Sequence, residues 1–465
     1  MNGTGSPRLA VLDVVGLTRR HLESGHMPRL AAFARRTGLS AFTETFPALT
    51  CSAQSTFVTG QAPGGHGVVG NGWYHRELCE VQFWKQPDKI VQGRKIWHRL
   101  REARPGATTA KVFWWYNMYS EVEFALTPRP MYPADGRKVF DIHTTPPDLR
   151  FGIQRPDQLG PFPFPAFWGP ASGIASSRWI ARAARWVEEK HAPTLNLVYL
   201  PHLDYPLQKL GPDHPSLPAE LSAIDAVAGE LVEFLEARGV GVVVVSEYGI
   251  VPVTNAIHLN RVLRAHGWLA VKDELGRDLL DAGASRAFAV ADHQIAHVYV
   301  NDPRILPAVR ETVAALPGVA TVRDPSDLGW APGSVAAMRA GDLVAVAAAD
   351  AWFAYPYWDD DARAPDFART VDIHRKPGYD PCELFIDPAL RWPALKVAGF
   401  LLRKKLGLRA LLEVVPLDAS LVRGSHGRPA DDPLDRPVFL GTRAPAVRAD
   451  TDVQAALLAG LGVGR

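Results

Sequence analysis

The stretch from Thr43 to Asn71 concentrates side chains that could perform nucleophilic chemistry. Its sequence, TETFPALTCSAQSTFVTGQAPGGHGVVGN, combines several hydroxyl groups, a turn rich in small residues and a final asparagine. A threonine hydroxyl is a weak nucleophile at neutral pH, so it must be activated by a base, a lowered pKa or a metal ion. The block is typical of a phosphoryl-transfer site, and other parts of the chain must supply the activator.

Polar side chains that could activate a hydroxyl lie at or just after three predicted strands. Asp13 lies within the first strand, His202 and Asp204 follow the second, and Glu247 and Tyr248 follow the third. Chemistry in a parallel sheet collects at the carboxyl ends of its strands. A single carboxylate at a strand end is about as often a helix N-cap as a catalytic group. The five residues together therefore indicate a site more strongly than any one of them.

The elements that must position these side chains alternate along the chain. Short apolar and β-branched runs predict strands at residues 9–16, 195–200, 241–245 and 297–300. Amphipathic helical patterns lead into the second and third of these runs. Strands that alternate with helices predict an α/β fold, with a mostly parallel central sheet covered by helices on both faces.

The chain is long enough for one large α/β domain with insertions. It has 465 residues, so we expect a single domain over residues 1–465. The segment at about 114–170 is dense in aromatic residues and prolines, and we expect an inserted, irregular lobe there, which either packs as core or forms a wall of the substrate pocket. A second insertion or cap is expected at about 303–370.

Composition excludes several classes of protein. The 51 basic and 49 acidic residues give a net charge of +2, which does not favour nucleic-acid binding. Three cysteines, Cys51, Cys79 and Cys382, without a CxxC pair, disfavour a disulfide framework and favour a reducing compartment. The N-terminus lacks a charged segment followed by a long apolar run, so we expect no signal peptide and a cytoplasmic location.

Contact with a membrane is confined to one candidate segment. No apolar run is long enough for a spanning helix. Residues 389–412 mix apolar residues with six basic residues and no acidic ones. This segment could lie on a membrane surface, or it could be an ordinary packed surface helix. The sequence does not specify an oligomeric state.

Several motifs resemble those of the nucleotide pyrophosphatase/phosphodiesterase branch of the alkaline phosphatase superfamily, which also includes phosphonoacetate hydrolases. Asp13, on an early strand, matches a metal-binding aspartate of that family. Thr50, eight residues before the VTG at 58–60, matches the nucleophile. Asn71, which ends the HG-x-V-x-N motif, matches a residue that contacts the phosphoryl oxygens. The resemblance covers nearly the full length of the chain.

Later motifs supply the remaining matches and three departures. Asp204 in DYPLQKLGP matches the first ligand of its motif, and His426 in GSHG matches the last ligand. Gln208 stands where the family has histidine, and Glu247 and Tyr248 in SEYG stand where it has an Asp-His pair. The resemblance implies two divalent metal ions, Zn²⁺ or else Mn²⁺ or iron. The implied ligands are Asp13, Thr50, Asp204, Gln208, Glu247, Tyr248 and His426.

Other histidines could replace the imidazoles that the three departures remove. The candidates are His202 beside Asp204, His293 in ADHQ and His374 in DIHRKPGYDP. A single histidine near a strand end is more often a hydrogen-bonded structural residue than a ligand.

The resemblance implies a metal-dependent phosphodiesterase or nucleotide pyrophosphatase that acts on small phosphate esters. Thr50 would form a phosphothreonyl intermediate, and Asn71 with the backbone near Cys51 would stabilise the developing oxyanion. Two alternatives remain: a phosphonoacetate-type C–P hydrolase, and a small-molecule binder whose metal site has decayed.

Overall fold

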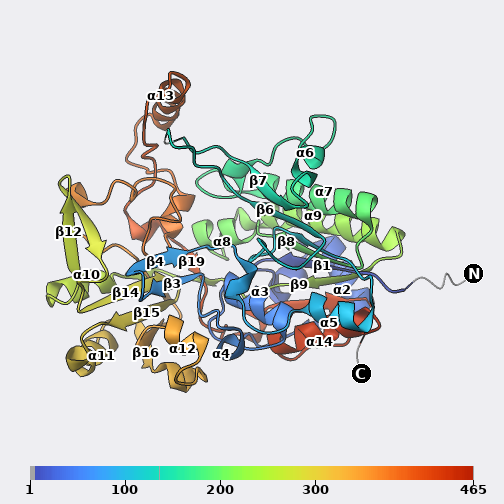
Figure 1. The fold of residues 1–465 in the computed structure, drawn as a ribbon, viewed down its shortest axis with the longest axis horizontal. Coiled ribbons are helices and arrows are strands. Elements are labelled where there is room, and N and C mark those ends of the chain that lie inside the picture. Colours follow the sequence, from blue (N-terminus) through green and yellow to red (C-terminus); the bar gives the residue numbers. More distant parts are fainter. Residues whose placement is uncertain (1–5, 136, 443, 464–465) are drawn as a thin grey trace, which may run out of the picture.

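A central sheet of eight strands organises the computed structural model, which describes residues 6–135, 137–442 and 444–463 (Figure 1). The strand order is β2-β20-β9-β1-β8-β5-β6-β7. The parallel strands in the middle are β9 (Gly241–Val245), β1 (Leu9–Val14), β8 (Leu195–Leu200), β5 (Thr109–Val112) and β6 (Phe124–Pro128). The antiparallel strands at the edges are β2 (Leu39–Ala41), β20 (Val438–Gly441) and β7 (Ile142–Thr145). The prediction of an α/β fold with a mostly parallel sheet is confirmed.

Helices cover both faces of this sheet, as predicted. One face packs against α3 (Thr50–Thr59), α5 (Ile96–Ala103) and α14 (Val453–Gly460). The other face packs against α2 (Pro28–Thr37), α7 (Ile174–His191) and α9 (Leu217–Ala237). Figure 1 shows α7 and α9 on one side of the sheet and α5 and α14 on the other.

The alternation of side chains along β1 determines where its carboxylate lies. Leu9 and Val11 belong to the hydrophobic layer with α3, whereas Ala10 and Leu12 belong to the layer with α7 and α9. Because side chains of a strand alternate between its faces, Asp13 lies on the same face as Leu9 and Val11. The strand therefore directs Asp13 towards α3.

A second, antiparallel sheet contains one strand that the sequence assigned differently. Its order is β14 (Ala287–Asp292), β15 (Ile295–Val300), β17 (Leu343–Ala347) and β16 (Val319–Arg323). The run at 297–300 was predicted as a strand of the central parallel sheet, and this prediction is wrong. Two residues join β14 to β15, and such a short connection permits only an antiparallel hairpin. The segment at 303–370 adds β16, β17, α11 (Leu306–Ala314) and α12 (Val335–Arg339) to this sheet.

The aromatic segment at 114–170 is partly regular. It contributes β6 and β7 to the central sheet and contains α6 (Leu149–Ile153). Part of it packs as core, because the Phe162 ring lies 4.7 Å from that of Phe113 and 5.1 Å from that of Trp179, centroid to centroid. The segment thus combines strands of the central sheet with aromatic residues packed as core, and the inserted lobe stays a prediction.

The remaining elements are short. The hairpins are β3 (Gly72–His75) with β4 (Glu80–Phe83) and β12 (Ala270–Glu274) with β13 (Arg277–Asp281). Two further pairs join β10 (Val251–Pro252) to β19 (Gly424–Ser425) and β11 (Asn255–Ile257) to β18 (Ala351–Phe353). The other helices are α1 (Arg19–Glu23), α4 (Pro63–His66), α8 (Asp204–Leu210), α10 (Leu259–Ala265) and α13 (Pro393–Lys405).

None of the helices in the described part of the chain combines the length and the apolar character needed to cross a membrane. Residues 1–5, which belong to the segment where no signal peptide was expected, lie outside the described residues.

Candidate active site

The carboxyl ends of three neighbouring parallel strands bring the predicted site residues together. The register aligns Asp13 of β1 with Tyr199 of β8 and Val245 of β9. Asp204 begins α8 just after β8, and Glu247 lies two residues beyond β9. The buried carboxyl groups of Asp13 and Glu247 and the largely buried one of Asp204 therefore gather at one edge of the sheet, where the N-terminus of α3 also lies.

Thr50 is the first residue of α3, and its side chain is buried. Its hydroxyl oxygen lies 2.8 Å from the Tyr248 hydroxyl oxygen, and Tyr248 in turn donates to Asp204 Oδ1 over 3.4 Å. The first N–H groups of a helix lack intrahelical partners, and the helix dipole there favours an anion. Thr50 thus lies where an incoming phosphoryl group would be attracted.

One amide connects two of the carboxyl groups. Gln54 Nε2 donates to Asp13 Oδ2 over 3.0 Å and to Glu247 Oε1 over 2.7 Å. The Trp115 N–H donates to Gln54 Oε1 over 2.7 Å, which fixes the orientation of the amide. Burial and the neighbouring Glu247 raise the pKa of Asp13 well above its usual range, and burial also raises the pKa of Glu247.

A second cluster surrounds Asp204. Gln208 Nε2 donates to Asp204 Oδ2 over 2.9 Å, and the Tyr379 hydroxyl donates to Gln208 Oε1 over 2.9 Å. His426 Nε2 lies 3.7 Å from Asp204 Oδ1, and His426 Nδ1 lies 2.9 Å from the Ala48 carbonyl oxygen. Burial raises the pKa of Asp204 to about 7 and lowers the pKa of His426 well below its usual value. His426 is therefore neutral, with Nδ1–H donating to Ala48 and a free lone pair on Nε2.

Stacked rings join the two clusters. The Tyr248 and His426 rings lie 3.6 Å apart with an interplanar angle of 8°, and the His293 and Tyr379 rings lie 3.7 Å apart. His293 also lies 3.9 Å from His426, centroid to centroid. The turn between β14 and β15 thus brings His293, one of the three substitute histidines considered above, next to the site.

Asn71 is held at the start of α3 by a residue of the second sheet. Asp292 Oδ2 accepts from the Asn71 N–H over 2.8 Å, and Asp292 Oδ1 accepts from Asn71 Nδ2 over 3.1 Å. Asn71 Oδ1 accepts from the Cys51 N–H over 3.1 Å. These three bonds set the Asn71 amide beside the residue that follows Thr50.

The contacts of the other two histidines lie elsewhere. His202 is buried, with Nε2 at 3.0 Å from Glu220 Oε2, and its N–H donates to the Ser177 hydroxyl. His374 Nδ1 lies 3.3 Å from the Phe83 carbonyl oxygen. Neither histidine belongs to the hydrogen-bonded set around Thr50.

Sequence reasoning missed three residues of the site. Gln54 lies four residues after Thr50, and helical periodicity alone places both on one face of α3. Trp115 and Tyr379 were not singled out, because no local pattern links them to Thr50.

The donor atoms of the two clusters fit divalent cations. In the described ranges, no three His, Cys, Asp or Glu side chains form a metal-binding group. However, Asp13 Oδ1, Glu247 Oε2 and His426 Nε2 are buried and have no hydrogen-bond partner there. Buried acceptors without donors are costly unless a cation satisfies them. The set is rich in oxygen, which suits a hard ion such as Mn²⁺ better than Zn²⁺.

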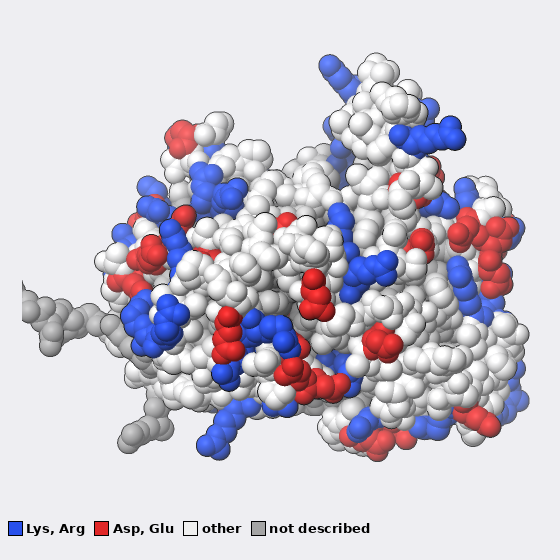
Figure 2. Space-filling view, turned by 180° about the vertical axis from the view of Figure 1, so that it is seen from behind, with Lys and Arg blue, Asp and Glu red and all other residues white. Residues whose placement is uncertain are grey.

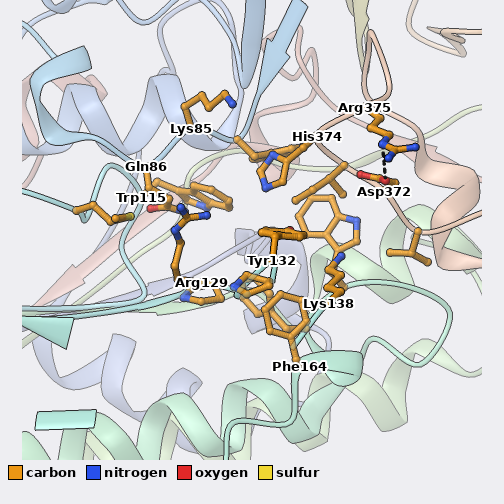
Figure 3. A pocket seen from close by; sticks show the side chains of 18 of the residues that line it. Lys85, Gln86, Trp115, Arg129, Tyr132, Lys138, Phe164, Asp372, His374 and Arg375 are labelled. Carbon is orange, nitrogen blue, oxygen red and sulfur yellow. Dashed lines mark ion pairs between the residues drawn. The ribbon is translucent and has the colours of Figure 1, made fainter. Parts of the chain in front are cut away.

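Aromatic residues, Trp115 among them, line a cavity of about 510 Å³ (Figure 3). Trp84 and Trp115 line it with ring centroids 4.9 Å apart, and Trp168 lies 5.0 Å from Trp84. The backbone N–H of Trp115 bonds to Gln54, whose amide in turn contacts Asp13 and Glu247. One residue of the cavity wall is therefore hydrogen-bonded to the site.

Basic side chains surround this cavity. Lys85, Arg129, Lys138 and Arg375 line it together with one acidic residue, Asp372. Figure 3 marks the ion pair of Arg375 with Asp372, whose atoms lie 3.6 Å apart. Within the described ranges, the other three basic residues form no ion pair. The cavity therefore suits a ligand that is both flat and negatively charged.

A comparison with family models and solved structures identifies the family of this chain and an alkaline phosphatase-like architecture. The family model described as type I phosphodiesterase/nucleotide pyrophosphatase matches residues 9–380, and the chain belongs to this family. Enzymes of the family generally use two divalent metal ions.

One curated relative is an uncharacterised pyrophosphatase/phosphodiesterase of Schizosaccharomyces pombe. It is 26% identical over 291 residues, which are 57% of this chain and 52% of the relative. The chain thus spans about half the length of that relative.

Two solved structures show the same fold at low sequence identity. One is murine ectonucleotide pyrophosphatase/phosphodiesterase 5, in an inactive form with AMP, which has a TM-score of 0.58 and 15% sequence identity. The match covers 98% of this chain and 95% of the murine chain. The other is phosphonoacetate hydrolase from Sinorhizobium meliloti, in complex with phosphonoformate, which has a TM-score of 0.59 and 14% sequence identity. The match covers 98% of this chain and 96% of the hydrolase chain.

The Gln54 bridge predicts a loss of stability when its donor is removed. Gln54→Leu leaves Asp13 and Glu247 buried without their shared N–H groups, so we expect the free energy of unfolding to fall by about 1–3 kcal/mol. Urea unfolding of metal-free protein measures this change. Gln61→Leu, at an exposed residue just beyond α3, is the matched control. Equal stability of the two variants would show that the bridge does not stabilise the fold.

Proposed function

We propose that the protein is a metal-dependent hydrolase of small phosphodiesters or nucleotide pyrophosphates, with Thr50 as its nucleophile. Family membership supports the reaction class. The observation that carries the residue assignment is the Thr50 hydroxyl at the N-terminus of α3, 2.8 Å from the Tyr248 hydroxyl. The Thr50 oxygen bonds to phosphorus as the bond to the leaving oxygen breaks, and water then hydrolyses the phosphothreonyl ester.

Asn71 is proposed to contact the phosphoryl oxygens. Its amide lies beside the first turn of α3, where Asp292 holds it and Cys51 N–H binds it. The positive end of the helix dipole supports the negative charge that develops on those oxygens. Asp292 is proposed as a positioning residue that acts through Asn71.

Two divalent ions are proposed, one near Asp13, Thr50 and Glu247 and the other near Asp204, Gln208 and His426. Such ions lower the pKa of a bound hydroxyl and neutralise phosphoryl charge. The oxygen-rich donors favour Mn²⁺ over Zn²⁺.

Tyr248 is proposed to orient Thr50 rather than to act as a metal ligand. Burial, with the nearby carboxyl groups of Asp204 and Glu247, holds the pKa of Tyr248 well above its usual value. The hydroxyl therefore stays neutral, and it can exchange hydrogen bonds with Thr50 and Asp204.

The aromatic cavity is proposed to hold the leaving group. Its tryptophans suit a flat group, and Lys85, Arg129 and Lys138 suit an additional negative charge. The same cations favour a second candidate function, a phosphonoacetate-type C–P hydrolase, because they could hold a carboxylate. A cavity of about 510 Å³ is larger than so small a substrate needs, and this supports the diester.

All three cysteines are free, and we propose a cytoplasmic location on this basis.

Replacement of the proposed nucleophile tests the reaction. Thr50→Ala should lower kcat for an aryl phosphodiester by at least about a thousandfold, because the covalent route is lost. Thr50→Ser, which keeps a hydroxyl, should retain measurable activity. Acid quenching followed by mass spectrometry should find phosphate on residue 50 in wild type and Thr50→Ser. Wild-type turnover that survives in Thr50→Ala would overturn the assignment, and hydrolysis of phosphonoacetate but not of diesters would favour the second candidate.

Metal analysis tests the two proposed ion sites. Protein purified with Mn²⁺ should bind two ions per chain, and chelation should abolish diester hydrolysis until Mn²⁺ is returned. His426→Ala removes a free imidazole lone pair, so the number of ions bound per chain of this variant should fall towards one. His214→Ala, at an exposed histidine, is the control. Full activity in protein that contains no metal would contradict the proposal.

Paired substrates test the basic lining of the cavity. Two aryl methyl phosphodiesters, with and without a carboxylate on the aryl ring, differ in the charge of the leaving group. Arg129→Met should lower kcat/KM for the carboxylated ester about tenfold and leave the neutral ester nearly unchanged. Arg178→Met, on an exposed position of α7, should alter neither. Equal effects of Arg129→Met on both esters would place the leaving group elsewhere.

A further inference from the structure

The segment from 388 to 413 leaves the body of the protein and returns to it at one point. The Asp387 N–H donates to the Val414 carbonyl oxygen over 2.7 Å and closes the base of this excursion. Its helix, α13, stands away from both sheets at the top of Figure 1. None of the residues of α13 is buried. The helix is therefore not held by a core, which distinguishes it from the packed surface helix that was the alternative.

Large apolar side chains of this excursion face solvent. Their exposed fractions range from 52% to 71%. They are Trp392, Leu395, Leu401, Leu402, Leu406, Leu408 and Leu411. A cluster of this kind on a folded protein marks an interaction surface.

Part of the cluster forms a stripe along the helix. Leu395, Leu402 and Leu406 are separated by seven and four residues, which brings their side chains close to one line at 3.6 residues per turn. All three are more than half exposed. The helix therefore exposes an apolar stripe that an ordinary surface helix would bury.

The charges of the same segment have one sign. Residues 389–412 contain no acidic side chain and six basic ones. The basic residues are Arg391, Lys396, Arg403, Lys404, Lys405 and Arg409. Figure 2 shows Lys and Arg side chains projecting from this helix, at the upper right. Exposed leucines with a tryptophan and flanking lysines and arginines are the composition of a helix that lies in a membrane interface.

The excursion contacts a segment that borders the proposed substrate cavity. Lys404 Nζ donates to the Lys138 carbonyl oxygen over 3.4 Å, and it lies 6.0 Å from the Phe140 ring centroid. Met131, Tyr132 and Phe140 are exposed apolar residues of this neighbouring segment. Tyr132 and Lys138 also line the cavity. The excursion therefore contacts a segment that carries exposed apolar residues and forms part of the cavity wall.

We propose that the excursion at 388–413 docks the protein on an anionic lipid membrane. The leucine stripe and Trp392 enter the interface between headgroups and acyl chains, and the basic residues meet anionic headgroups. Met131, Tyr132 and Phe140 extend the contact to the cavity, which then lies next to the lipid surface. A membrane fits better than an acidic protein as the partner. The helix protrudes from the body of the protein, its exposed apolar residues suit the acyl region, and its charged residues are all basic.

Vesicle flotation tests the apolar part of this contact. Wild-type protein should float with vesicles of phosphatidylcholine mixed with phosphatidylglycerol, and much less with phosphatidylcholine alone. The double variant Leu395→Asp/Leu402→Asp should weaken this binding at least about a hundredfold, or about tenfold for each leucine. Leu275→Asp, at a fully exposed leucine in the β12–β13 turn, should bind like wild type.

Charge and folding controls complete the test. Arg403→Gln/Lys405→Gln should weaken binding to anionic vesicles and reduce its dependence on salt. Hydrolysis of a soluble aryl diester should be equal in all these variants, and this readout separates lost docking from lost folding. The proposal is overturned if wild type does not bind anionic vesicles, or if the double variant binds as tightly. Self-association in sedimentation velocity that the double variant abolishes would also overturn it, because a second copy would then cover the leucines.

Discussion

The gathering of three carboxyl groups, two buried and one largely buried, at one edge of the central sheet is the constraint on which the rest of the site depends. Asp13, Asp204 and Glu247 meet there because β1, β8 and β9 run parallel in register, and burying them is costly without compensation. The surrounding groups supply that compensation as neutral donors: Gln54 serves two of the carboxyl groups, and Gln208 and Tyr248 serve the third. The nucleophile candidate joins the same network, so its position and the stability of the fold are coupled.

Much of this arrangement could be predicted from the sequence, because the signals are local. Apolar runs defined β1, β8 and β9, and the rule that parallel strands bring their carboxyl ends together predicted that Asp13, Asp204 and Glu247 would converge. The pattern at 297–300 correctly predicted a strand but not its sheet, because an apolar run carries no information about its partner. Only the two-residue connection to β14 distinguishes a hairpin from a parallel crossover.

The residues that sequence reasoning missed lie far along the chain from the groups they serve. Tyr379 bonds to Gln208, and nothing in the local sequence of either residue indicates the contact. The cavity has the same dependence on distant residues, since Lys85 lies in one segment, Arg129 and Lys138 lie in a second, and Arg375 lies in a third. Gln54 is different. Its spacing of four residues from Thr50 places both side chains on the same face of α3, so helical periodicity is a sufficient signal for this neighbour.

The departures from the family pattern change how a cation must bind. Gln208 and Tyr248 now hydrogen-bond to Asp204, while Gln54 Nε2 lies between Asp13 and Glu247. Hydrogen bonds to charged groups contribute about 1.5–3 kcal/mol each, so the carboxylates are partly satisfied without any ion. An ion between Asp13 and Glu247 must displace the Gln54 amide. The loss of the two Gln54 hydrogen bonds therefore reduces the net affinity of this site for the ion. His426 Nε2 has no such competitor. The two proposed ion sites should therefore differ in affinity, with the site at His426 losing its ion last.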